Sequence, residues 1–261
     1  MRIACGLLGA VIVLIGCLAL PARADAETVQ PCRTGRPVVL VHGAGADAAT
    51  SFSVLAPLLR TDGFCVHAPN YGAAAGLLGR TTWGTADLRS SAAELQRVFD
   101  AVRGAGQVDV VAHSAGGTAV RYLIASGYRG VHALVALGAP NQGTTFGGLR
   151  RTYPDLALLG LRNEQIARQV FGVAGAQLLP GSPMSGLEVV AGVEYTMIAT
   201  RTDEVVTPPE SALLPGARNI WLQDGCPHLR TTHSALLAEP RALHHVRAAL
   251  DPSAAGRSAP C

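Results

Sequence analysis

Lysine is absent from this sequence, and all 21 of its basic residues are arginine. The arginines are scattered along the chain without aromatic residues between them, so the pattern typical of a nucleic-acid-binding surface is missing. Charged residues amount to only 15% and aromatic residues to 5%, while 49% of the chain is hydrophobic. This balance excludes a disordered or fibrous chain and allows a sizeable core. The length of 261 residues favours one large domain, and we expect no nucleic-acid partner.

Long hydrophobic runs are also absent, apart from one at the start of the chain. A Met-Arg start precedes an almost unbroken apolar stretch, residues 3–20, and Ala22 and Ala24 provide the small residues of a cleavage site. We therefore expect residues 1–24 to be a signal peptide and the protein to be secreted. A bacterial lipobox-like motif ending at Cys17 gives an alternative, in which a lipid on this cysteine attaches the protein to a membrane.

No pair of cysteines has the C-x-x-C spacing of a zinc site, and there is no acidic cluster that suits calcium, so we expect no metal. Cleavage of the signal peptide leaves Cys32, Cys65, Cys226 and Cys261, an even number in an oxidising compartment. The first two lie near apolar strand-like runs and the last two flank the final helical stretch. We expect disulfides between residues 32 and 65 and between 226 and 261. Residues 251–261 are expected to be a loose tail held only by Cys261.

Strand-like and helix-like segments alternate from residue 37 onward. Short apolar runs predict strands, and apolar residues at helical spacing, bounded by Asp87 as an N-cap and by glycines, predict helices. The expected strands are 37–41, 64–68, 108–112, 131–137, 195–200 and 219–222, and the expected helices include 53–60, 87–103 and 117–126. Such alternation predicts a doubly wound, mostly parallel α/β domain over residues 25–261.

A nucleophile-elbow pattern joins one of these strands to the next helix. The nucleophile-elbow motif G-x-S-x-G indicates a catalytic serine when it lies between a strand and a helix. That position is occupied here by the segment Ala112-His113-Ser114-Ala115-Gly116, which follows an apolar strand and begins a helix. A turn this tight needs small residues two places before and two places after the serine, and Ala112 and Gly116 satisfy that requirement. Ser114 is therefore the candidate nucleophile. The alternative is a serine that only caps the following helix.

A serine hydroxyl needs an imidazole to accept its proton, and that imidazole needs a carboxylate on its other nitrogen. In α/β-hydrolases both follow the serine in the chain, the acid before the histidine. Asp203 lies just beyond the strand 195–200 and is the leading acid. Spacing does not exclude the adjacent Glu204, and Asp224 and Asp155 are weaker alternatives.

The loop after the last expected strand carries two candidate bases, His228 and His233, and their positions in the sequence do not separate them. The remaining histidines have less suitable positions. We expect His244 and His245 to be ordinary residues of the terminal helix, His42 and His113 to support the site, and His67 and His132 to be ordinary strand or loop residues.

Several motifs together resemble those of the bacterial secreted class 2 lipases, serine triacylglycerol lipases or carboxylesterases of the α/β-hydrolase superfamily. The resemblance spans about residues 32–250 and rests on the segments 38–43, 68–72, 112–117, 141–144 and 200–208. It implies Ser114 as nucleophile, Asp203 as acid and His233 as base. Together with the elbow geometry it implies an oxyanion hole formed by the backbone N–H groups of Ala44 and Ala115. No cofactor is expected.

Residues 141–193 form an apolar insertion between two expected strands. This cap would either open as a lid on lipid or pack permanently on the core. The expected partners are a lipid or other small ester substrate and, transiently, a lipid interface. The sequence carries no signal for an oligomeric state. Two other functions use the same fold: a catalytically silent protein that binds a lipid or a partner, and an extracellular acyltransferase.

Overall fold

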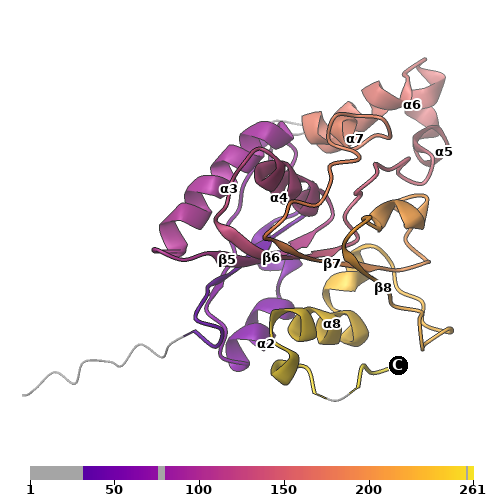
Figure 1. Cartoon of the computed structure of the whole chain (residues 1–261). Helices are drawn as coiled ribbons and strands as arrows, with labels where there is room; N and C mark the ends of the chain where they lie inside the picture. Colours follow the sequence, from indigo (N-terminus) through magenta and orange to yellow (C-terminus); the bar gives the residue numbers. More distant parts are fainter. Residues whose placement is uncertain (1–31, 76–79, 257) are drawn as a thin grey trace, which may run out of the picture. The chain divides into compact units, whose positions relative to one another are not determined.

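The computed structural model describes residues 32–75, 80–256 and 258–261 (Figure 1). The signal peptide expected at residues 1–24 and the alternative lipid attachment at Cys17 therefore lie outside the described residues. No helix in the described ranges has both the length and the apolar character that crossing a bilayer requires.

Six parallel strands form the central sheet, in the spatial order β2-β1-β5-β6-β7-β8. Their bounds are β1 Val38–Val41, β2 Val66–His67, β5 Val108–His113, β6 Val131–Leu137, β7 Glu194–Ala199 and β8 Arg218–Trp221. The chain first adds β2 on one side of β1 and then continues with β5 on the other side. Ligand sites of such sheets lie at the carboxyl ends of the strands, near the point where the strand order reverses. A separate antiparallel ribbon joins β3 (Ala74–Ala75) to β4 (Thr81–Thr82).

Helices cover both faces of the sheet, with α3 and α4 on one face and α2 and α8 on the other (Figure 1). Their bounds are α2 Leu55–Thr61, α3 Leu88–Val102, α4 Ala115–Ala125 and α8 Pro240–Leu250. Along β1, Val39 and Val41 belong to the apolar cluster with α3 and α4, while Val38 and Leu40 belong to the cluster with α2 and α8. Burial on both faces explains why this strand is continuously apolar in the sequence. The predicted doubly wound parallel architecture is confirmed.

Local hydrogen bonds set the ends of the elements. The side chain of Asp87 accepts from the backbone N–H groups of Arg89 and Ser90 and so caps α3, as expected. The strand expected at 64–68 is shorter, because the N–H of Phe64 donates to the carbonyl oxygen of Leu59 at the end of α2. The short helices outside residues 141–193 are α1 Ala48–Ser51, η2 Pro209–Ala212, η3 Ser234–Leu237 and η4 Pro252–Ala254.

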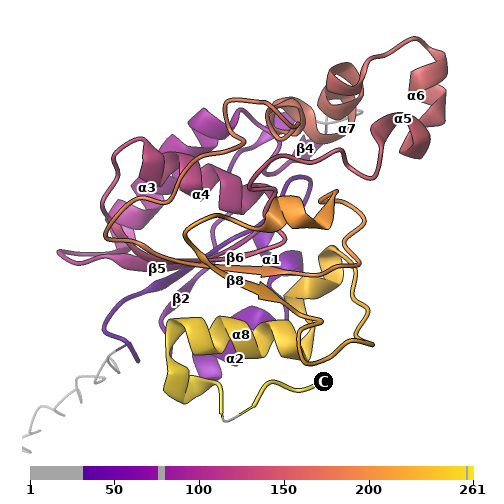
Figure 2. The same cartoon turned by 45° about the vertical axis from the view of Figure 1, so that its right-hand side comes forward.

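The insertion at 141–193 carries three helices, α5 (Leu149–Thr152), α6 (Pro154–Leu158) and α7 (Asn163–Gln177). They lie on the same side of the sheet as α3 and α4 (Figure 2). Gly172 interrupts α7 with a φ of 68°, and a Cβ atom there would overlap the carbonyl oxygen of Thr85. The kink therefore lets α7 pack closely against the chain just before α3.

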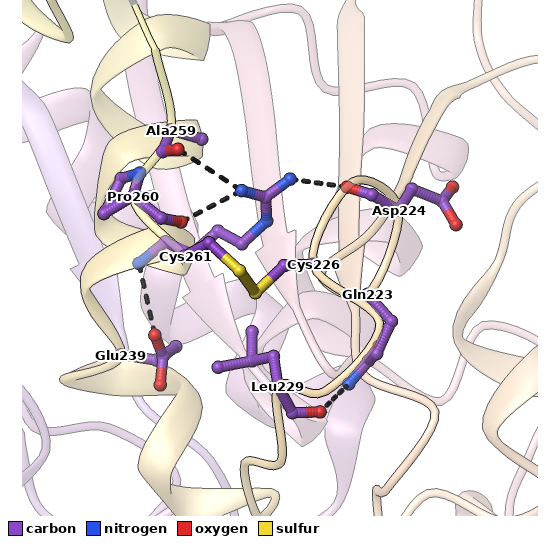
Figure 3. Close-up of a disulfide and its surroundings, with 9 residues drawn as sticks. Gln223, Asp224, Cys226, Leu229, Glu239, Ala259, Pro260 and Cys261 are labelled. Atoms are coloured by element: carbon purple, nitrogen blue, oxygen red, sulfur yellow. Dashed lines mark hydrogen bonds between the residues drawn. A yellow bond between two sulfur atoms is a disulfide. The ribbon is translucent and has the colours of Figure 1, made fainter.

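The described cysteines lie in two pairs at disulfide distance, the pairs expected from the sequence. The Cα atoms are 5.1 Å apart for Cys32 and Cys65 and 5.5 Å apart for Cys226 and Cys261. Figure 3 shows that the second disulfide lies beside the backbone of Ala259 and Pro260. The expectation of a tail held only by Cys261 is wrong, because the Arg241 guanidinium donates to the carbonyl oxygens of both residues.

Candidate active site

Ser114 occupies a sharp turn between β5 and α4. Its φ of 53° and ψ of −129° make it one of two non-glycine residues with positive φ in the described ranges. Backbone strain of this kind concentrates at functional sites. Ser114 stands at the N-cap position of α4, but its side chain makes no capping hydrogen bond. The geometry therefore gives no support to the capping role that the sequence left open.

Two glycines allow the turn to approach β1 and the loop that follows it. A Cβ atom at Gly116 would lie 2.5 Å from the carbonyl oxygen of His42, and one at Gly43 would lie 3.0 Å from Cβ of Ser114. The first contact is too close for any side chain, and the second would require Ser114 or the loop to shift. Glycine at these positions lets the turn and the loop 43–45 lie side by side.

Asp203 and His233 meet across two loops, the first after β7 and the second just before η3. Nδ1 of His233 lies 2.9 Å from Oδ2 of Asp203, and both side chains are buried. The other carboxylate oxygen of Asp203 accepts from the backbone N–H groups of Val205 and Val206, at 2.9 and 2.8 Å. With Nδ1–H donating to the carboxylate, Nε2 of His233 is left to accept a proton.

The alternative acids lie elsewhere. Glu204 does not face the His233 ring, because its carboxylate accepts from the His233 backbone N–H at 3.0 Å. Asp224 pairs with Arg201 on the surface, and Asp155 is exposed on α6. Of the candidate carboxylates, the structure brings only Asp203 to the histidine ring.

The alternative bases are also separate from this pair. His228 is exposed, and His244 and His245 lie on α8. The His233 ring, by contrast, packs over Gly138 at the end of β6, where a Cβ atom would lie 3.1 Å from Nδ1. Because β6 pairs with β5, this position adjoins the end of the strand that carries Ser114. The Ser114 hydroxyl makes no hydrogen bond to any residue in the described ranges.

Of the two residues expected to form an oxyanion hole, Ala115 follows Ser114 in the chain and Ala44 follows Gly43, where a Cβ atom would lie 3.0 Å from Cβ of Ser114. Ala115 begins α4 and is fully buried, and Ala44 follows Gly43 in the adjacent loop. Within the part of the chain that the structure describes, neither N–H donates a hydrogen bond. Ala115 is buried and Ala44 is half-buried, and both N–H groups can donate to an acceptor on a ligand.

His42 and His113 form the buried surroundings of this turn. Burial lowers the pKa of His113 to about 3, so this imidazole is neutral at ordinary pH, and its Nε2–H donates to the His233 carbonyl oxygen at 3.1 Å. Burial also lowers the pKa of His42, whose ring packs against Tyr71 at 4.6 Å between centroids. Their positions agree with the supporting role expected of both residues.

The two histidines expected to be ordinary strand or loop residues lie away from the elbow. His67 is exposed on the edge strand β2, and His132 pairs with Asp109 at the start of β5, 2.7 Å apart. Among the described residues, no three histidine, cysteine, aspartate or glutamate side chains are grouped so that they could hold a metal ion.

One buried residue was missed by the sequence reasoning. Arg121 lies on α4 with 2% of its surface exposed, and its guanidinium donates to the side-chain and backbone oxygens of Asn141 and to the carbonyl oxygen of Leu187. It joins both ends of the 141–193 insertion to α4. An arginine inside an otherwise apolar helix was the signal for this role.

The insertion combines a packed base with an exposed tip. Phe146, Leu149, Ile166, Ala167 and Ala174 are buried in the same apolar cluster as α3 and α4. Leu158 and Leu159, in contrast, are 86% and 74% exposed.

A family model described as "Alpha/beta hydrolase family" matches residues 38–258. No curated protein matches the chain. Solved structures share the fold at low identity. A carboxylesterase of the ammonia-oxidizing thaumarchaeon Nitrososphaera gargenis has 17% identity over 84% of this chain and 90% of its own, with a TM-score of 0.57. A meta-cleavage product hydrolase from Pseudomonas fluorescens has 17% identity over 84% of this chain and 92% of its own, with a TM-score of 0.56. A pyrethroid hydrolase from Sphingobium faniae has 18% identity over 84% of this chain and 98% of its own, with a TM-score of 0.53.

Proposed function

This chain belongs to the alpha/beta hydrolase family, and on that premise we propose that it is a secreted serine hydrolase of carboxylic esters. The observation that carries the proposal is the buried pair of Asp203 and His233 beside the strained turn at Ser114. A nucleophile, a base and an orienting carboxylate are the minimum set for acyl transfer, and the strained turn and the buried pair supply one candidate for each.

The proposed reaction proceeds through an acyl-enzyme. Nε2 of His233 removes the proton of Ser114 while Oγ attacks the ester carbonyl carbon, and Asp203 stabilises the imidazolium that forms. The N–H groups of Ala44 and Ala115 donate to the negatively charged oxygen of the tetrahedral intermediate. The intermediate collapses as the alkoxide leaves with the proton from His233. Water, activated by the same imidazole, then releases the acid and restores the serine.

We further propose a lipid ester as substrate, in line with the resemblance to class 2 lipases. Leu158 and Leu159 at the tip of the insertion support this proposal, because two adjacent leucines with most of their surface exposed suit contact with an apolar surface. The buried base of the insertion favours a packed cap over a fully mobile lid. We propose that residues 25–261 form one domain, with 141–193 as its cap, and that residues 1–24 direct export.

Replacement of the nucleophile tests the reaction. We expect Ser114→Ala to abolish hydrolysis of p-nitrophenyl butyrate and to prevent covalent labelling by a fluorophosphonate probe, whose site is located by peptide mass spectrometry. Ser126→Ala, at the far end of the same helix, is the matched control and should retain full activity. A wild-type protein as inactive as Ser114→Ala would instead identify a catalytically silent binding protein.

A chain-length profile tests the substrate class. Rates should be measured with p-nitrophenyl esters from two to eighteen carbons, with and without an emulsified interface. A lipase should show higher rates on long chains and a gain at the interface. A maximum at the shortest esters without such a gain would indicate a carboxylesterase.

A further inference from the structure

Three consecutive residues of the loop after β7 bind two residues at the end of the loop before η3. The Thr202 hydroxyl donates to the Thr231 carbonyl oxygen at 2.7 Å, and Asp203 accepts from the His233 ring. The Glu204 carboxylate accepts from the backbone N–H of His233 at 3.0 Å. The two neighbouring carboxylates therefore hold different parts of one histidine, Asp203 its ring and Glu204 its backbone.

The backbone of His233 is held on its other side as well. Nε2–H of His113 donates to the His233 carbonyl oxygen at 3.1 Å. Both polar groups of this residue's main chain thus have side-chain partners, one from the loop after β7 and one from the last residue of β5. His233 itself follows a stretch without regular structure and stands before the four-residue helix η3. Regular secondary structure alone would not fix the direction of its Nε2.

We propose that Glu204 is a positioning residue that fixes the catalytic base through the backbone N–H of His233. The proposal rests on the ester hydrolase function proposed above. A hydrogen bond to an ionised carboxylate is stronger than one between neutral groups, so Glu204 can determine where the imidazole lies relative to Ser114. Reaction rates are sensitive to this placement, since a shift of about 1 Å can cost on the order of 100-fold.

Burial separates the positioning role from a role in folding. Asp203 and His233 are buried, and their replacement removes interactions within the core. Glu204 is exposed apart from this contact, so its removal should leave the fold intact. Its effect should therefore appear in kcat rather than in KM or in the melting temperature.

Glu204→Ala and Glu204→Gln, compared with wild type, test the proposal. We expect Glu204→Ala to lower kcat by roughly 10- to 100-fold, with KM and Tm unchanged. Glu204→Gln should recover most of the rate, because its amide oxygen can still accept the hydrogen bond. Glu210→Ala, another exposed glutamate on the same segment, is the matched control and should match wild type.

A spectroscopic measurement tests the positioning independently of turnover. In protein labelled with ¹⁵N-histidine, the proton shared by His233 Nδ1 and Asp203 should give a downfield NMR signal that shifts or broadens in Glu204→Ala and returns in Glu204→Gln. A kcat within twofold of wild type together with an unchanged NMR signal would overturn the proposal. A parallel fall of kcat and Tm that glutamine does not restore would also overturn it.

Failure of the proposed function would be recognised separately. In that case wild type and Ser114→Ala would be equally inactive, while the NMR comparison would still show whether Glu204 fixes the imidazole. The two proposals can therefore fail independently of each other.

Discussion

The ring centroids of His113 and His233, 120 residues apart in the sequence, lie 4.6 Å apart. A hydrogen bond from the His113 side chain to the His233 carbonyl oxygen joins the two residues. The histidine beside the candidate nucleophile thereby supports the candidate base directly.

Asp203→Asn should lower kcat by about 10³- to 10⁴-fold. The asparagine amide can donate to Nδ1 of His233, which favours the tautomer whose Nε2 already carries a proton and cannot accept another. Steady-state kinetics on p-nitrophenyl butyrate provide the measurement. Asp224→Asn, which changes an exposed carboxylate paired with Arg201, is the control. If Asp203→Asn kept a tenth of the wild-type kcat, a residue other than Asp203 would be the acid of the triad.

His113 should make the folded state sensitive to acid. Its pKa falls from 6.5 in the unfolded chain to about 3 in the folded protein because of burial. Between these values the unfolded state binds one more proton than the folded state, so stability is fully present above pH 6.5 and declines as the pH falls toward 3. The slope is about 1.4 kcal/mol per pH unit.

Denaturant unfolding of wild type and His113→Gln between pH 7 and 4 measures this contribution. Glutamine can still donate to the His233 carbonyl oxygen but does not titrate. The variant should lose stability less steeply than wild type as the pH is lowered. Equal slopes for the two proteins would show that His113 carries no such proton linkage.

Gly116→Ala should destabilise the protein by more than about 2 kcal/mol and reduce its activity. The added Cβ would lie 2.5 Å from the His42 carbonyl oxygen and 2.7 Å from that of Val41, which would push the elbow away from β1. Gly106→Ala is the control, because its nearest contact is an ordinary 3.6 Å. Unfolding midpoints of the two variants give the comparison, and similar midpoints would contradict the expected close approach.

Removal of the disulfide between Cys226 and Cys261 should affect both stability and catalysis. With a separation of 35 residues, the loss is about 4 kcal/mol in the chain-entropy model. Cys226 also anchors the loop that leads from β8 to His233, so kcat of the Cys226→Ser/Cys261→Ser protein should fall. Cys32→Ser/Cys65→Ser, with a separation of 33 residues, should lose similar stability but keep its kcat at a temperature where both variants are folded. Equal kcat values for the two variants would show that the anchor does not affect the base.

Leu158→Ser/Leu159→Ser should lower activity on emulsified esters severalfold and leave activity on a soluble short ester unchanged. The replaced leucines expose most of their apolar surface, and burial of such surface at a lipid interface is favourable. Val54→Ser, an exposed apolar residue before α2, is the control. An equal loss of activity on emulsified and soluble esters would show that these leucines support the folded structure rather than contact a lipid interface.

The strands were predictable where both of their faces are buried. The expected strand 131–137 coincides with β6, because nearly all of its side chains are buried and its sequence is apolar apart from His132. The edge strand at 64–68 was overestimated, since Phe64 is buried without joining the sheet and its N–H caps the end of α2 instead. Apolarity in the sequence reports burial, but pairing depends on hydrogen bonds that the sequence does not display.

The candidate site was only partly determined by spacing. Asp203 and Glu204 are adjacent, so only the direction of the chain after β7 decides which carboxylate faces the ring and which faces the backbone. His228 and His233 lie in one loop, and their positions in the sequence do not show which of them points toward Asp203. Roles that depend on tertiary contacts, such as that of Arg121 across the insertion, follow from the folded chain alone.

Under the proposed function, this protein becomes active only once the chain that follows β8, an edge strand of the sheet, has docked. β8 pairs with β7 alone, and His233 follows β8 in the chain. A refolding molecule that has assembled β1, β2, β5 and β6 would already show much of the native circular dichroism while its serine still lacked a proton acceptor. Recovery of turnover therefore reports the docking of β8 and of the loop that carries His233, not the formation of the rest of the sheet. It should lag behind the circular dichroism signal during renaturation.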